Sequence, residues 1–217
     1  FMLGEHEWWA KNTQPWYSEL ARTPLFIWDP RAQRQGTTVD SLAQMIDLPA
    51  TLLDFFGVTR PADMQGVPLR DAIATGAPAR PTALFGVHGG HVNVTDGRYV
   101  YMRAPQQPTN QPLYEYTLMP ARMRRLFTTT ELKDATLVEP FSFTKNMPLL
   151  KVTGSTTVDA HSFGTLLFDL ENDPQQEHPI QDTALEERMI ALLVAAMQAN
   201  EAPPEQYARL GLDSYVR

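Results

Sequence analysis

The run Gly4-Glu5-His6-Glu7-Trp8-Trp9-Ala10-Lys11-Asn12 opens this chain of 217 residues and sets a lysine, an imidazole and carboxylates beside two tryptophans. The apolar run Thr23-Pro24-Leu25-Phe26-Ile27-Trp28 follows closely. Because such a mixture is unusual at the start of a chain, we expect Phe1 to be an internal position of a larger protein, just after part of its active site. The short apolar run from Leu25 to Trp28 predicts a strand buried on both faces, as in a parallel sheet covered by helices.

Composition narrows the class of protein. The formal net charge is −7, which argues against a nucleic-acid surface because such surfaces need clustered Lys and Arg. The basic group around Arg122, Arg124 and Arg125 is interpreted as a solvated helix face. There is no cysteine, so the chain itself offers no disulfide, no thiolate metal site and no cysteine-derived nucleophile. No stretch approaches the roughly 18 apolar residues that a membrane span needs, so we expect no membrane partner.

The first part of the chain, residues 1–78, is predicted to be α/β. Asp47 to Gly57 predicts a helix, with Asp47 as N-cap, Pro49 in the first turn and Gly57 as the stop. Its apolar face is expected to contain Leu48, Leu52, Leu53 and Phe56. Pro68 to Ala74 predicts a second, short helix. The linker-like run from Thr75 to Pro81 places a boundary between two subdomains, 1–78 and 79–217.

The second part, residues 79–217, is predicted to be a small antiparallel sheet backed by a helix. Asp96-Gly97 lies between two β-prone runs and indicates a hairpin. A further strand is expected at 165–170 and a long helix at 184–199. Residues 103–164 are harder to interpret: Pro120 to Phe127 favours a helix, and Phe141 to Pro148 an ordered loop that covers something.

Few side chains alone point to a reaction. His88 and His91 flank Gly89-Gly90 in a turn between strands, where they either line a cleft or are ordinary loop residues. Helical metal-binding spacing of histidines, phosphate-loop spacing and a G-x-S-x-G serine are all absent from the sequence. We therefore expect no metal site on this chain.

Ordered sequence blocks resemble the sulfatase family of the alkaline phosphatase superfamily, at the segment that follows its metal-binding Asp-His or Asp-Asn pair. Gly4-Glu5-His6, the two tryptophans and Lys11 match the start of that segment. The later matching blocks occur in the family's order: Glu19-Leu20-Ala21-Arg22-Thr23-Pro24-Leu25, Val39-Asp40-Ser41-Leu42, Leu48-Pro49-Ala50-Thr51-Leu52-Leu53-Asp54, Met64-Gln65-Gly66-Val67-Pro68-Leu69, Gly97-Arg98-Tyr99 and Leu167-Phe168-Asp169-Leu170-Glu171-Asn172-Asp173-Pro174.

The resemblance implies a fold and an activity. The fold is the C-terminal part of an alkaline-phosphatase-like α/β domain, followed by a small antiparallel β-sheet subdomain packed on a C-terminal helix. The activity is sulfate ester hydrolysis with a formylglycine and a divalent metal, usually calcium. Lys11 maps onto the family's sulfate-binding lysine, and the alternative is a solvated loop lysine. His88 and His91 fall where family members contribute substrate-selecting loops.

The departures from the family matter as much. The chain has neither a cysteine nor a Ser-x-Pro-x-Arg run, and the metal-binding pair would precede Phe1. We expect calcium and formylglycine only in a full-length parent. We expect the isolated chain to be inactive, and to pair either with an N-terminal portion or with a second copy of itself. Two alternatives stay open: a fragment of a phosphodiesterase or phosphonate monoester hydrolase of the same superfamily, and a non-catalytic interaction fragment.

Overall fold

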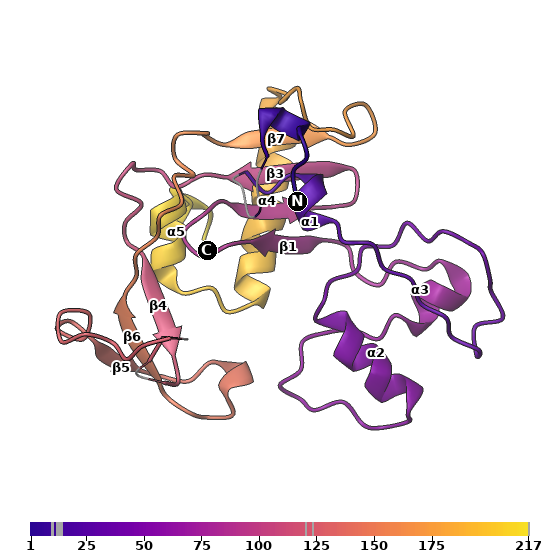
Figure 1. Ribbon diagram of the computed structural model, residues 1–217, viewed down its shortest axis with the longest axis horizontal. Helices are drawn as coiled ribbons and strands as arrows, with labels where there is room; N and C mark the ends of the chain where they lie inside the picture. Colours follow the sequence, from indigo (N-terminus) through magenta and orange to yellow (C-terminus); the bar gives the residue numbers. More distant parts are fainter. Residues whose placement is uncertain (10, 12–14, 120, 123, 217) are drawn as a thin grey trace.

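The computed structural model describes residues 1–9, 11, 15–119, 121–122 and 124–216. Its main sheet has four antiparallel strands in the order β1-β2-β3-β7. Their bounds are Ala83–Gly86 for β1, Val92–Thr95 for β2, Tyr99–Arg103 for β3 and Leu166–Asp169 for β7. The long helix α4 (Thr183–Ala199) lies across one face of this sheet, and α5 (Pro204–Leu210) lies beside it (Figure 1). The predicted antiparallel sheet packed on a C-terminal helix is therefore confirmed.

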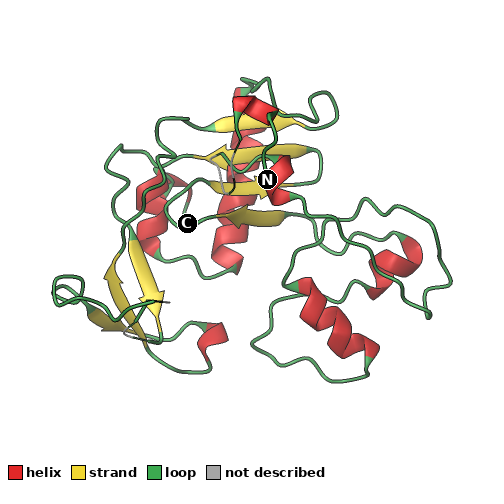
Figure 2. Ribbon diagram, in the orientation of Figure 1, coloured by secondary structure: helices red, strands yellow, loops and turns green. Residues whose placement is uncertain are grey.

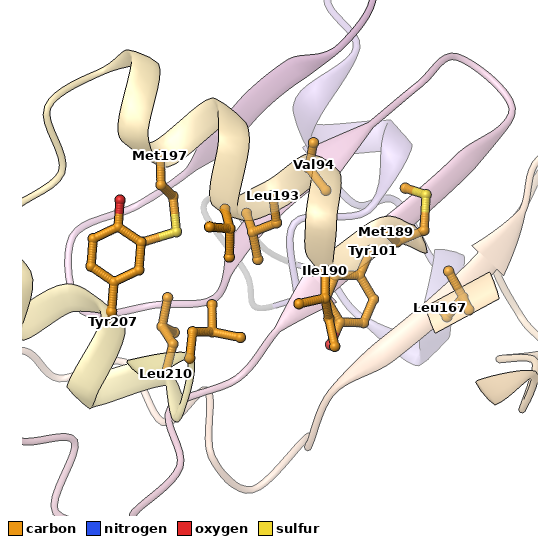
Figure 3. Close-up of a cluster of buried hydrophobic side chains, with 11 residues drawn as sticks. Val94, Tyr101, Leu167, Met189, Ile190, Leu193, Met197, Tyr207 and Leu210 are labelled. Carbon is orange, nitrogen blue, oxygen red and sulfur yellow. The ribbon is translucent and has the colours of Figure 1, made fainter. Parts of the chain in front are cut away.

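Local sequence signals explain this core. In the β2–β3 hairpin the Asp96 carboxylate accepts the backbone N–H groups of Arg98 and Tyr99, and Gly97 adopts a φ of 99°. Helix α4 begins after Asp182, whose carboxylate accepts the Leu185 N–H as an N-cap. The apolar face of α4 packs on the sheet in one buried cluster (Figure 3), whose members include Val94, Tyr101, Leu167, Met189, Ile190, Leu193, Met197, Tyr207 and Leu210.

A second sheet occupies the stretch of sequence that was hard to interpret. Strands β4 (Tyr114–Thr117), β6 (Leu149–Thr153) and β5 (Thr136–Val138) pair antiparallel in the order β4-β6-β5, and they lie apart from the main sheet (Figure 2). The predicted helix from Pro120 to Phe127 is wrong, because Ala121 and Leu126 form a β-bridge across a turn there; Pro120 and Met123 lie outside the described residues. The loop expected at 141–148 contains a short 3-10 helix, η2 (Ser142–Thr144).

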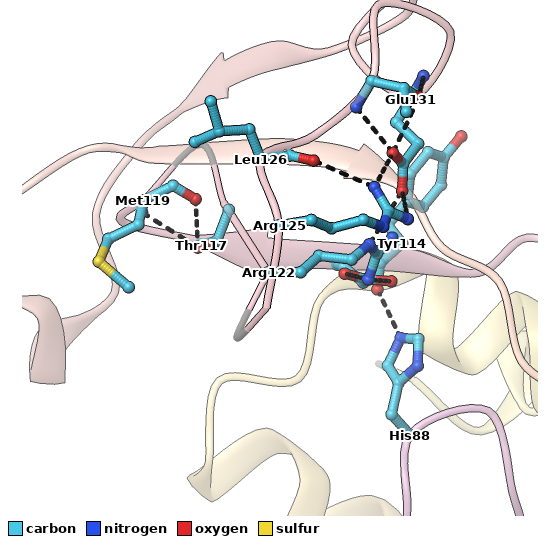
Figure 4. Close-up of polar contacts among 10 residues, drawn as sticks. His88, Tyr114, Thr117, Met119, Arg122, Arg125, Leu126 and Glu131 are labelled. Atoms are coloured by element: carbon cyan, nitrogen blue, oxygen red, sulfur yellow. Dashed lines mark hydrogen bonds and ion pairs between the residues drawn. The ribbon is translucent and has the colours of Figure 1, made fainter.

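The basic group within that turn is not a helix face, and two of its three members, Arg122 and Arg125, are ion-paired. Arg122 bonds both Glu115 and Glu131, and Arg125 bonds Glu131, as the dashed lines of Figure 4 show. The guanidinium of Arg125 lowers the pKa of the Glu131 carboxyl well below its usual range, and the N–H of Thr128 adds to the effect. The turn is thus held by carboxylates from neighbouring segments.

Residues before 83 form short helices joined by long loops. These short helices are η1 (Glu5–Glu7), α1 (Ser18–Ala21), α2 (Asp47–Phe55) and α3 (Arg70–Thr75). A further 3-10 helix, η3 (Asp213–Tyr215), lies near the C-terminus. The helix at 47–57 is confirmed, with Gly57 left-handed after it. No helix among the described residues is long and apolar enough to cross a membrane.

The buried strand expected from Leu25 to Trp28 is wrong. None of the described residues before 83 belongs to a strand, and the side chains of Phe26 and Trp28 are 92% and 75% exposed. A strand that is apolar on both faces needs neighbours on each side, and no described strand pairs with this run. The segment is therefore an exposed apolar surface.

The predicted apolar face of α2 is wrong for two of its four residues, since Leu48 and Leu53 are half-buried and the other two are exposed. Leu52 and Phe56 are exposed, whereas the buried side of the helix carries Asp47, Ala50 and Thr51. Polar contacts cause this orientation: the Asp47 carboxylate accepts the Val67 N–H and pairs with Arg80, and the Thr51 hydroxyl accepts the Leu69 N–H. Asp47 is the first helical residue and not the N-cap.

The proposed boundary at 78/79 stays a prediction, although contacts cross it. Arg80 reaches back to Gln44 with a bond of 2.8 Å, and the Gln44 amide donates to the Leu84 carbonyl at 2.7 Å. Near the N-terminus, the Tyr17 ring packs edge-on against Phe168 of β7 with centroids 6.1 Å apart. Segments from both predicted subdomains therefore contact the main sheet.

Candidate functional site

Lys11 lies in the N-terminal segment, between a tight turn and α1. The turn is closed by the Gly4 N–H, which donates to the Trp8 carbonyl at 2.9 Å. The His6 ring stacks on Tyr17 at 3.7 Å between centroids. Lys11 itself is exposed, and it makes no hydrogen bond or ion pair with another described residue. Its ammonium is accordingly available to an anion.

His88 lies exposed at the tip of the β1–β2 turn. The turn is closed by the Gly90 N–H, which donates to the Val87 carbonyl at 2.9 Å, and Gly89 adopts a φ of 74°. The Nε2 atom of His88 lies 3.2 Å from the carbonyl oxygen of Tyr114 in β4, the contact drawn in Figure 4. This contact directs the imidazole toward the second sheet, and the residue as a whole stays exposed.

His91 is buried below the same turn. Only 1% of it is exposed, and its Nε2 lies 2.8 Å from the Gly164 carbonyl. Burial lowers the pKa of the imidazole, the bond to Gly164 partly opposes that effect, and the charge of Arg209 adds to it. A buried imidazole of lowered pKa is neutral near pH 7, which suits a side chain that holds the turn in place.

Arg209 and Asn110 support the turn from beneath, and sequence reasoning missed both. Arg209 is 2% exposed, and its Nη1 donates to the Gly90 carbonyl at 3.2 Å and to Asn110 Oδ1 at 2.9 Å. The Asn110 amide in turn donates to the Gly89 carbonyl at 2.7 Å. Burial lowers the pKa of Arg209 to about 10. Both carbonyls of the glycine pair are therefore bonded to buried side chains, which fixes the backbone that presents His88.

The structure brings His88 and His91 into one turn but separates their roles, because one ring is exposed and the other is buried. Lys11 belongs to a different segment, and no hydrogen bond or ion pair among the described residues connects it to the turn. Nothing in the sequence marked Arg209, since a lone arginine in a short amphipathic helix resembles a solvated residue.

The residues of this chain do not fit the formylglycine and the calcium ion that the resemblance implies. The sequence contains no cysteine and no Ser-x-Pro-x-Arg run from which a formylglycine could be made. Across the part of the chain that the structure describes, no three His, Asp or Glu side chains gather as a metal site would require.

A family model described as N-sulphoglucosamine sulphohydrolase, C-terminal, matches residues 4–139. The chain belongs to the sulfatase family. The match covers the Lys11 segment, the β1–β2 turn with both histidines, and the start of the second sheet. It corresponds to the C-terminal portion of such proteins, as the sequence blocks predict.

Two sulfatases of known name are similar over a shorter range. An N-acetylglucosamine-6-O-sulfatase of Bacteroides thetaiotaomicron is 40% identical over 73 residues, which are 34% of this chain and 13% of that protein. An arylsulfatase of Clostridium perfringens is 35% identical over 75 residues, which are 33% of this chain and 15% of that protein. The matched regions span less than a sixth of either relative.

A solved structure shares the fold. It is a complex with the substrate D-glucosamine-2-N,6-O-disulfate, and it aligns with a TM-score of 0.58 over 91% of this chain and 32% of that chain, at 19% identity. The likeness extends over nearly all of the residues, so it concerns the fold of most of the chain. The chain spans about a third of the length of that structure.

Proposed function

We propose that this chain is the substrate-facing C-terminal portion of an enzyme that hydrolyses sulfate esters. The observation that carries the proposal is the family match from residue 4 to 139, which includes the Gly-Glu-His turn and the exposed Lys11. The names of both relatives, a 6-O-sulfatase and an arylsulfatase, support the same reaction class. The activity belongs to the full-length parent and not to these residues alone.

Lys11 is proposed to bind the sulfuryl oxygens. A lysine ammonium is a compact charge on a flexible stem, and it offsets negative charge that grows on a tetrahedral oxyanion in the transition state. Lys11 suits this role because it is exposed and holds no carboxylate among the described residues.

His88 is proposed to contact the organic part of the substrate. His91 is proposed to hold the turn that carries His88, without contacting the substrate. The exposed His88 ring can reach a ligand, whereas the buried His91 holds the turn through Gly164. We propose a sulfated sugar as the substrate class, because one relative is named for a sulfated amino sugar and the solved relative contains another.

The rest of the reaction is assigned to the parent. We infer that the formylglycine and the divalent cation, usually calcium in this family, are held outside these 217 residues. The exposed run from Leu25 to Trp28 suits pairing with that portion or with a second copy, because neighbouring exposed apolar side chains can form an interaction site.

The test uses the full-length parent and this chain side by side. We expect the parent to hydrolyse p-nitrophenyl sulfate faster than p-nitrophenyl phosphate or bis-p-nitrophenyl phosphate, to lose activity with a chelator and to recover it with calcium. We expect no turnover by the isolated chain. A parent that prefers a phosphate ester would place the protein among the phosphodiesterases or phosphonate monoester hydrolases of the superfamily. Calcium-dependent hydrolysis by the chain alone would contradict the proposal that the catalytic groups lie outside it.

A further inference from the structure

We propose that a polar hollow beside His88 binds the hydroxyl groups of a sugar ring; this inference names the sugar-binding part of the proposed function and rests on it. The hollow has a volume of about 330 Å³ and lies between two loops, 108–113 and 154–159. That volume is at the small end of the range for ligand pockets, roughly 300–1,000 Å³. It suits one sugar residue better than a larger ligand.

The floor of the hollow is fixed by buried groups. Leu113 is 1% exposed, and its carbonyl accepts the Gly154 N–H at 2.8 Å. Asn110 lies in the same floor and is bonded to Arg209 and to the Gly89 carbonyl. A site whose lining is held by such bonds needs little rearrangement when a ligand binds.

Unused hydrogen-bonding groups line the walls. The hydroxyls of Thr109, Ser155 and Thr157 make no hydrogen bond to any other residue that the structure describes. The side-chain amide nitrogen of Gln111 also lacks a hydrogen bond to the described residues. Only the amide oxygen of Gln111 is bonded, because it accepts the Leu113 N–H at 3.0 Å. Each of the three hydroxyls can both donate and accept, and the amide nitrogen can donate, so together they match the hydroxyls of a sugar.

The charge of the hollow excludes the sulfate group as its ligand. Asp159 is the only ionisable residue among those that line it, and no lysine or arginine is present. A carboxylate repels an anion but accepts strong hydrogen bonds from hydroxyl groups. The hollow is therefore suited to the uncharged part of a sugar, while a sulfate requires a cation such as Lys11.

His88 connects the hollow to the predicted substrate-binding turn. A Cβ built on Gly154, in the wall of the hollow, would lie 3.2 Å from the Cε1 atom of His88. The absence of a side chain at Gly154 thus lets the imidazole lie against the wall. His88 is not itself a lining residue, but it borders the hollow across Gly154, and this places the hollow next to the turn.

The experiment titrates unsulfated N-acetylglucosamine into the 217-residue chain and follows backbone amide shifts by NMR. We expect saturable shifts at residues 109–111 and 155–159, and weaker binding by about 2- to 10-fold for each of Ser155→Ala and Thr157→Val, the usual effect of one lost neutral hydrogen bond. Thr130→Val is the matched control, because Thr130 is an exposed loop threonine that lacks a side-chain hydrogen bond to the described residues. It should leave binding unchanged.

Three results would overturn the inference. They are shifts that avoid the two loops, binding that is unaffected by Ser155→Ala and Thr157→Val, and shifts at 155–159 caused by inorganic sulfate in place of the sugar. Because this assay needs no turnover, it is independent of the proposed reaction. If the chain binds the sugar but the parent does not hydrolyse sulfate esters, the sugar site stands and the proposed reaction is refuted. If the parent hydrolyses sulfate esters but the chain does not bind the sugar, only the sugar site is refuted.

Discussion

The turn that presents His88 should be intolerant of a methyl group at Gly89. This residue has a φ of +74°, and a Cβ built there would lie 2.6 Å from both the Cβ and the Cγ2 atoms of Thr156. Since the Cβ of Thr156 is attached directly to its backbone, the clash cannot be relieved by rotating a side chain. Gly89→Ala must displace one of the two loops.

Two costs add in this variant. A non-glycine residue in the left-handed region costs roughly 1–2 kcal/mol. Forcing an additional carbon into a packed site costs typically about 1–3 kcal/mol. We therefore expect Gly89→Ala to lower the free energy of unfolding by about 2–5 kcal/mol.

Gly36→Ala is the matched control. Gly36 has a φ of +61°, and no atom lies within 4 Å of the Cβ position, so only the backbone cost of roughly 1–2 kcal/mol applies. The assay is urea unfolding of the chain, followed by circular dichroism. Thr156→Gly removes the clashing atoms. Adding Gly89→Ala to Thr156→Gly should therefore lower the free energy of unfolding only by as much as Gly36→Ala does in the unchanged chain. Equal losses for Gly89→Ala and Gly36→Ala would refute the packing argument.

Three further predictions concern the core, the acid limit of stability and the exposed apolar run. Leu193→Ala in α4, at a side chain with no exposed surface, should lower the free energy of unfolding by about 2–5 kcal/mol in the same urea assay, and a loss below about 1 kcal/mol would contradict the packing of α4 on the sheet. The Arg98 guanidinium lowers the pKa of Asp169 from 3.8 to about 2, so the ionised carboxylate stabilises the fold fully above pH 4 and this stabilisation disappears as the pH falls through 2. Asp169→Asn should therefore flatten this part of the curve of unfolding free energy against pH. An unchanged curve would argue against the Arg98–Asp169 pair. Phe26→Ser, at a ring that is 92% exposed, should reduce self-association of the isolated chain in analytical ultracentrifugation without changing its unfolding midpoint, whereas a lowered midpoint would show that the ring is packed in solution.

Elements with local signals could be predicted from the sequence. Asp96-Gly97 marks the β2–β3 hairpin because the turn itself needs those residues, and α4 follows from apolar residues at helical spacing. The second sheet could not be predicted in the same way. Tyr114–Thr117 pairs with Leu149–Thr153, so its register depends on residues far apart in the chain and on no shared turn.

Two errors have a common physical origin. The continuous apolar run from Leu25 to Trp28 and the helical spacing of apolar residues in α2 both predict burial, but neither pattern identifies the surface that would bury them. In this chain no described strand pairs with the first, and α2 is oriented by Asp47 and Thr51 in place of its leucines. Polar anchoring of this kind leaves no periodic signal.

The candidate site was found only in part. The spacing His88-Gly89-Gly90-His91 indicates a turn, but it does not distinguish the exposed ring from the buried one. Arg209 lies far along the chain from the turn it supports, so only the folded structure brings them together. Lys11 was identified by motif position, and its role stays a prediction.

The most direct test of the central proposal is kcat/KM of the full-length parent for p-nitrophenyl sulfate, with and without Lys11→Ala. Removing one donor to a developing oxyanion typically costs about 10²- to 10³-fold, so we expect a loss of that size. Lys133→Ala, at another exposed lysine of the same chain, serves as the control and should stay within about twofold of the parent. A parent that hydrolyses the ester equally well without Lys11 would contradict the proposal that this chain takes part in the chemistry.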